Sequence, residues 1–162
     1  MRKNKIVNTD DAVLTEILVG VKTLAAAVKS TLGPGGRNVL IESENGNAFV
    51  TKDGVTVAKS INVKDPIHNI GMQMIKEAAS RTATTAGDGT TTATVLAEEI
   101  FTSGLRQLAH GANGIALKRG IDIAVQKAVE LLAANSTNIT TDEQIKQIGS
   151  VSANNDKEIG SL

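Results

Sequence analysis

Three short segments of this chain combine glycine with hydroxyl or acidic residues in patterns that could hold a phosphate group. The first, Gly87-Asp88-Gly89-Thr90-Thr91-Thr92, lies between two expected helices. The first amides of a helix lack internal partners and, with the helix dipole, form an anion site. The glycines let the backbone approach a ligand, and Asp88 suits Mg²⁺, which binds through few carboxylates plus phosphate oxygens. An ordinary helix–loop–helix turn capped by threonines explains the same residues without a ligand.

The other two segments each have a functional and a structural interpretation. Residues 31–37 (TLGPGGR) could form a second backbone wall around a phosphate, or could simply end a helix. In residues 52–54 (KDG), Lys52 could offset phosphate charge, and Asp53 could bind a cation or orient a water molecule. A turn with two exposed charges is the structural alternative. None of the three segments has the Gly-Lys-Ser/Thr ending of a Walker A loop.

The elements that must position these segments are mostly helices. Apolar residues recur at helical spacing in four stretches, which predicts helices over residues 9–29, from Asp65-Pro66 up to Gly87, and over about 90–108 and 113–134. Asn45-Gly46 between two apolar runs predicts a β-hairpin over residues 37–51. Overlapping capping boxes, Thr140 with Glu143 and Thr141 with Gln144, predict a short helix to about residue 148, and a last helix opens at 154–156. The fold class predicted is mainly α with a small β-hairpin.

The amino-acid composition excludes several classes of function. The 162 residues carry 17 basic and 17 acidic side chains, so the chain is not a general nucleic-acid or polybasic membrane binder. Aromatic residues make up 1%, which excludes base stacking on aromatic platforms. The absence of cysteine excludes disulfides and thiolate metal sites. We find no apolar run suited to a signal peptide or to a spanning helix of roughly 18 residues. We therefore expect a soluble protein that is not exported by that route and has no nucleic-acid or membrane partner.

Taken together, these segments resemble the group I chaperonins, the sixty-kilodalton heat-shock chaperones of bacteria, mitochondria and chloroplasts. The glycine-aspartate-glycine-threonine run is highly specific in this context, and the similar stretches follow the family's order and spacing. They are residues 31–38, 51–55, 86–96, 117–122 and 151–154.

The resemblance implies a multihelical fold and a place within a longer protein. Residues 1–134 would be the N-terminal half of an equatorial, ATP-binding domain, and residues 135–162 would begin the intermediate domain. The parent protein would be an ATP-dependent folding chaperonin of the bacterial cytoplasm, a homo-oligomer built of heptameric rings. Non-native client proteins and a co-chaperonin would bind an apical domain that these residues do not include.

The resemblance also assigns residues to a nucleotide site. Lys52 matches a nucleotide-site lysine, and Asp88 matches the Mg²⁺-binding aspartate. Asp53 matches an aspartate close to the attacking water, which gives it a catalytic role in positioning water or a cation. The backbones of Thr31 and Lys52 would lie near a potassium ion. Phosphate contacts would come from Thr31, Leu32, Gly33 and Pro34, and from Asp88, Gly89, Thr90, Thr91 and Thr92. Gly35 stands where many relatives have lysine, so one positive charge near the loop is missing.

Two other functions remain open alongside an ATP-driven chaperonin subunit. One is a non-catalytic, equatorial-like interaction protein that caps or joins the rings of a full-length partner. The other is a Mg-nucleotide switch without folding activity. Under all three hypotheses we expect the 162-residue chain to hydrolyse ATP poorly or not at all by itself, because the apical domain and the remainder of the site that the resemblance implies lie outside it.

Overall fold

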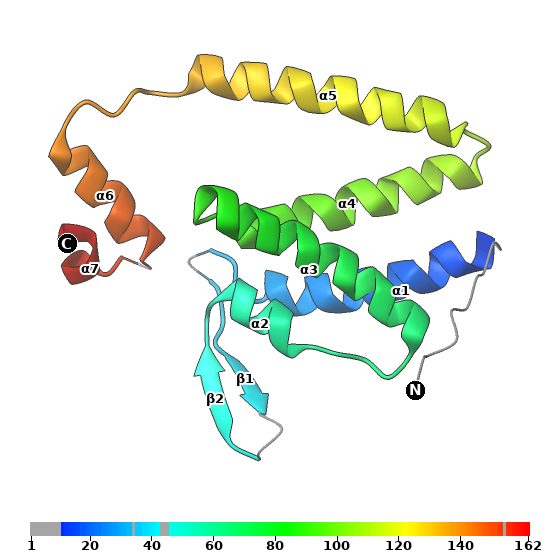
Figure 1. Ribbon diagram of the computed structural model, residues 1–162, viewed down its shortest axis with the longest axis horizontal. Helices are drawn as coiled ribbons and strands as arrows, with labels where there is room; N and C mark the ends of the chain where they lie inside the picture. The colour runs from blue at the N-terminus through cyan, green and yellow to red at the C-terminus, as the bar shows by residue number, and fades with distance from the viewer. Residues whose placement is uncertain (1–10, 34, 43–45, 154) are drawn as a thin grey trace. The chain divides into compact units, whose positions relative to one another are not determined.

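The computed structural model describes residues 11–33, 35–42, 46–153 and 155–162, and it confirms a mainly helical fold with one small β-sheet (Figure 1). The chain forms two compact units, residues 1–111 and 112–162. The first contains α1 (Asp11–Lys29), β1 (Val39–Glu42), β2 (Ala48–Thr51), α2 (Gly54–Ser60), α3 (Pro66–Ala86) and α4 (Thr90–Ala109); the second contains α5 (Gly114–Asn135), α6 (Asp142–Ser152) and α7 (Lys157–Ser161).

The core of the first unit is aliphatic and lies among its four helices. Its buried apolar residues come from α1, α2 and α3, with Ala97 and Phe101 of α4 packed against them: Val21, Leu24, Ala25, Val28, Val57, Ala58, Met72, Ile75 and Ala79. Glycines let α1 and α3 approach closely. A Cβ on Gly20 would lie 1.8 Å from the carbonyl oxygen of His68, and one on Gly71 would lie 2.1 Å from that of Ile17. This spacing cannot accommodate a side chain, so the crossing requires glycine at both positions.

The β-hairpin forms as predicted. The two strands are antiparallel, with Val39 opposite Thr51 and Leu40 opposite Val50. Val39 packs against the core, whereas Leu40 and Val50 are 70% and 59% exposed. The predicted turn residue Asn45 lies outside the described residues, while Gly46 adopts a φ of +77°, as a tight hairpin turn requires.

Most helix ends follow the sequence signals. Asp65 caps α3, with Pro66 at its first position, and Asn113 caps α5. α6 begins with one capping box and not with the two overlapping ones: Thr141 pairs with Gln144, and the Thr140–Glu143 box was a wrong prediction. The Thr140–Glu143 box does not form because the Thr140 amide already donates to the Gln144 side chain, at 2.8 Å.

Helix α2 was not predicted. Residues 55–57 are Val-Thr-Val, a β-branched run that disfavours helix. The helix forms because Asp53 caps its first turn and because Gly54, Val57 and Ala58 are buried against the neighbouring helices. Tertiary packing therefore overrides the local preference.

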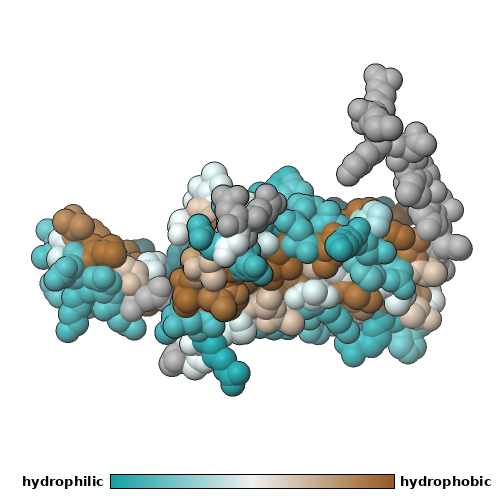
Figure 2. Space-filling model, turned by 90° about the horizontal axis from the view of Figure 1, so that it is seen from below, coloured by the Kyte–Doolittle hydropathy of each residue, from teal (hydrophilic) through white to brown (hydrophobic). Residues whose placement is uncertain are grey.

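The second unit exposes much apolar surface. No residue of α5 is buried, and Ile123 and Leu132 are 69% and 70% exposed. In the view from below, apolar side chains also reach the surface between hydrophilic ones (Figure 2). α7 is capped by Asp156 and forms where a last helix was expected. It packs closely on α6, because a Cβ on Gly160 would lie 1.9 Å from Ser150 Oγ. The predicted domain boundary between residues 134 and 135 stays a prediction. Within the described ranges, no helix combines the length and apolar character needed to cross a membrane.

Candidate functional site

Gly54 is the point at which the three candidate segments meet. A Cβ built on Gly54 would lie 2.4 Å from Thr91 Oγ1 and 3.5 Å from Thr31 Oγ1. Gly54 itself is buried and directly follows Lys52 and Asp53. The fold therefore brings the loop after α1, the connection from β2 to α2 and the start of α4 into one place, although they lie far apart in the sequence.

The loop after α1 closes on itself. The Arg37 amide donates to the Ser30 carbonyl at 2.7 Å, and the Gly36 amide donates to that of Gly33 at 2.9 Å. Gly33 has a φ of +72°, and a Cβ on Gly36 would lie 2.3 Å from the Thr31 carbonyl oxygen. Glycine is thus required at both positions. Leu32 is exposed within this loop, and Pro34 lies outside the described residues.

The start of α4 presents backbone amides. Gly87 and Gly89 have φ values of +76° and +81°, which turn the chain sharply between α3 and α4. Gly89 is the N-cap of α4, and no side chain caps the helix. The first amides of the helix, at Thr90, Thr91 and Thr92, have no carbonyl partner within the helix by geometry. They therefore suit an anion such as a phosphate oxygen.

Asp88 is exposed at this turn, and its Oδ1 accepts from the Gly89 amide at 2.6 Å. The described residues hold no cluster of three acidic or imidazole side chains that could form a metal cage. Mg²⁺ needs no such cage, because it keeps several waters and binds through one or two carboxylates plus phosphate oxygens. A single exposed aspartate beside a candidate phosphate site fits that donor set.

Asp53 caps α2. Its Oδ2 accepts from the Thr56 amide at 2.9 Å and from Thr56 Oγ1 at 2.5 Å, while Oδ1 accepts from the Val55 amide at 3.3 Å. Partial burial alone raises the pKa of Asp53, but the hydrogen bonds from Thr56 and Val55 and the nearby Lys59 charge outweigh it, so the pKa is lowered. Asp53 is therefore a carboxylate at neutral pH. Lys52, its neighbour, is exposed.

Sequence reasoning weighed residues 52–54 as a turn or as a site formed by Lys52 and Asp53, and it did not single out Gly54. The sequence signal for a special role of Gly54 was weak, because a lone glycine after an aspartate is common in turns. Only the packing of α2 against α1 and α4 shows that this position must lack a side chain. The pattern that indicates this position is a glycine directly after a helix-capping aspartate, with the apolar pair Val57-Ala58 three residues further on.

The chain matches the TCP-1/cpn60 chaperonin family over residues 24–161, and it therefore belongs to that family. Among solved structures, it is similar to a group III chaperonin whose crystal structure was determined in the open state. The TM-score is 0.78 and the sequence identity 25%, and the match covers 93% of this chain and 30% of the chaperonin. This chain thus spans less than a third of the length of the chaperonin that it matches.

Proposed function

We propose that this chain is the N-terminal, ATP-binding part of a group I chaperonin subunit. The observation that carries the proposal is the convergence of the three glycine-containing segments at Gly54 in a chain of the chaperonin family. Positioning and charge neutralisation, more than covalent chemistry, are what a protein must supply for phosphoryl transfer. Backbone amides, a lysine and a metal-binding aspartate gathered at one place suit that task.

Each candidate residue has a role in this proposal. The phosphates contact residues 31–34 on one side and the first amides of α4, at residues 89–92, on the other. Lys52 offsets negative charge, and Asp53 orients water or a cation. Asp88 holds Mg²⁺, which supplies charge neutralisation on the phosphate oxygens, and the backbones of Thr31 and Lys52 hold K⁺.

Ring assembly and folding activity are proposed for the whole protein. We propose a homo-oligomer of heptameric rings in the bacterial cytoplasm, in which ATP binding reorients the domains. Client proteins and a co-chaperonin bind parts of the protein outside this chain. Alone, the chain should show little ATP turnover, because the match covers only 30% of the chaperonin's length.

Calorimetric titration with Mg-ATP tests the proposal, using the wild-type chain, Asp88→Ala and the matched control Asp122→Ala on α5. We expect Asp88→Ala to weaken Mg-ATP binding about ten-fold, equivalent to about 1.4 kcal/mol, and the control to bind like the wild type. In EDTA, Asp88→Ala and the wild type should bind ATP equally, because the metal is absent. Equal affinities with Mg²⁺ present would rule out the Asp88 role.

Failure of the wild-type chain to bind ATP would contradict the proposal itself. Sedimentation with a full-length chaperonin would then test the ring-joining alternative, which predicts a discrete complex. ATP binding without any folding activity in the intact protein would favour the nucleotide-switch alternative.

A further inference from the structure

An ion pair joins the two helices that lead into the candidate site. Lys29 is the last residue of α1, and its ammonium contacts the carboxylate of Glu98 on α4. The Glu98 side chain is 12% exposed and that of Lys29 is 41% exposed. A carboxylate so far removed from water needs a charged partner, and among the described residues no other ion pair joins α1 to α4.

The position of the pair links two walls of the site. Lys29 immediately precedes Ser30, whose carbonyl closes the loop by accepting from Arg37. Glu98 lies seven residues after Thr91 on the same helix, which is roughly 10 Å along the axis. The ion pair therefore connects the closed loop, at its base, to the helix whose first amides form the opposite wall.

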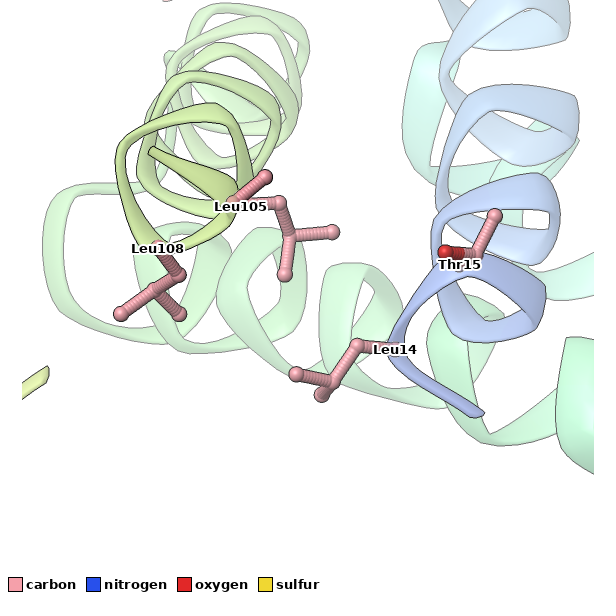
Figure 3. Close-up of a pocket in the computed structure, with 5 residues that line it drawn as sticks. Leu14, Thr15, Leu105 and Leu108 are labelled. Carbon is pink, nitrogen blue, oxygen red and sulfur yellow. The ribbon is translucent and has the colours of Figure 1, made fainter. Parts of the chain in front are cut away.

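Among the described residues, no ion pair joins the start of α1 to the end of α4. There, Leu14 and Thr15 of α1 face Leu105, Leu108 and Ala109 of α4 across a pocket of about 460 Å³. Figure 3 shows Leu14 and Leu105 extending into the space between the helices. An ion pair thus joins the C-terminal end of α1 to the middle of α4, and an apolar pocket separates the start of α1 from the end of α4.

We propose that Lys29 and Glu98 are positioning residues for the nucleotide site. Their ion pair holds the loop at residues 31–33 at the correct distance from the start of α4, so that both walls contact the same phosphate groups. This inference rests on the proposed ATP site and adds to it two residues that need not touch the nucleotide. A Lys29 that contacted phosphate directly would give a different pattern of mutant effects.

The test compares Lys29→Met, Glu98→Gln and the charge-swapped double variant Lys29→Glu/Glu98→Lys. Lys22→Met and Glu99→Gln serve as matched controls, since both residues are exposed on the same two helices. Circular dichroism first establishes that each variant folds. Lys29→Arg is measured as a second variant at this position in case Lys29→Met does not fold. Mg-ATP affinity is then measured by calorimetry for every folded variant.

Positioning predicts that both single variants weaken Mg-ATP binding by about three- to thirty-fold. The charge swap and Lys29→Arg should restore most of the affinity, and the controls should leave it unchanged. Weaker binding in Lys29→Met together with unchanged or tighter binding in Glu98→Gln would overturn the proposal, because it would mean that Lys29 itself contacts the phosphate. Unchanged affinity in both variants would overturn it as well.

A second measurement separates this inference from the proposed function. The chain has no cysteine, so spin labels can be attached at Ala26→Cys on α1 and Leu96→Cys on α4, both exposed. Without nucleotide, the label-to-label distance distribution should broaden in Lys29→Met and in Glu98→Gln, and narrow again in the charge swap. If the wild-type chain binds no ATP, the proposed function fails, and an unchanged distance distribution then overturns the positioning role independently.

Discussion

At the scale of single residues, the candidate site depends on positions where a side chain cannot fit. Gly36 faces the Thr31 carbonyl and Gly54 faces Thr91 Oγ1, both at distances that exclude a Cβ. The sequence predicted that the glycine-rich segments allow close backbone approach, and it predicted a helix start near Thr90. It could not show which glycine is indispensable, because that depends on contacts between residues far apart in the chain.

Gly35 is a different kind of glycine, and its replacement by lysine should strengthen nucleotide binding. Apart from its two chain neighbours, no atom of the described residues lies within 4 Å of a Cβ built there, so a side chain has room at this position. An added surface charge near a phosphate should tighten Mg-ATP binding about two- to five-fold at low salt, and less at high salt. Gly120→Lys on α5, which is equally open, is the control. An equal gain in that control would argue against a local effect.

Asp53→Ala should destabilise the first unit by about 1 kcal/mol at pH 7, because α2 loses its N-cap. Urea unfolding measures the loss. Asp53→Asn should keep most of the stability, since asparagine also caps helices well. If Asp53 acts on water in the intact chaperonin, Asp53→Asn should still fold but lose ATP turnover. Normal turnover in that variant would exclude this role.

The effect of Asp53 on stability should depend on pH. Its pKa is lower in the folded chain than the ordinary value, so its contribution is fully present above the unfolded-state pKa of about 3.9. It is lost as the pH falls through the lower folded pKa. The stability difference between wild type and Asp53→Ala should therefore be constant from pH 7 to about pH 5 and narrow below about pH 4. A stability difference between the two proteins that grows as the pH falls would contradict this prediction.

At the scale of elements, α2 shows where sequence reasoning was insufficient. The longer helices were predictable from apolar periodicity and from caps such as Asp65 and Asn113. α2 has seven residues and begins with a β-branched run, so neither its length nor its propensity indicated a helix. It is stabilised by contacts with other helices that no local pattern contains, and these contacts place Gly54 in the site.

A double-mutant cycle tests the close contact between α2 and α4. Gly54→Ala should lower the free energy of unfolding by about 1–3 kcal/mol, because its methyl group would overlap Thr91 Oγ1. Thr91→Ala removes that oxygen, so it should recover much of the stability in the double variant. Val28 Cγ1, at 3.3 Å, limits the recovery. Strictly additive effects in chemical denaturation would show that the two residues do not contact each other.

At the scale of the whole molecule, hydrophobic periodicity and motifs were enough to predict a mainly helical chaperonin relative. The family match over residues 24–161 confirms that relation at the level of the family. The matched chaperonin is more than three times longer than the matched region. The sequence could not show how much apolar surface its helices leave exposed, because burial depends on packing partners that periodicity does not identify.

The exposed apolar residues of α5 should make the isolated chain self-associate. Val129 and Leu132 are 60% and 70% exposed, and surface patches of this kind promote association. Val129→Lys/Leu132→Lys should shift the sedimentation profile toward monomer without changing Mg-ATP affinity. Gln126→Lys/Ala128→Lys, which adds the same charge at exposed polar and small residues of the same helix, should do so less. Equal effects of both variants would point to net charge and not to the apolar residues.

The central claim is that three distant segments form one nucleotide site, and NMR amide mapping during an Mg-ATP titration tests it most directly. The amides of residues 31–33, 52–54 and 89–92 should shift together and saturate along one binding curve, while those of α6 stay unchanged. Shifts confined to one of the three segments, or no shift at saturating Mg-ATP, would contradict the account.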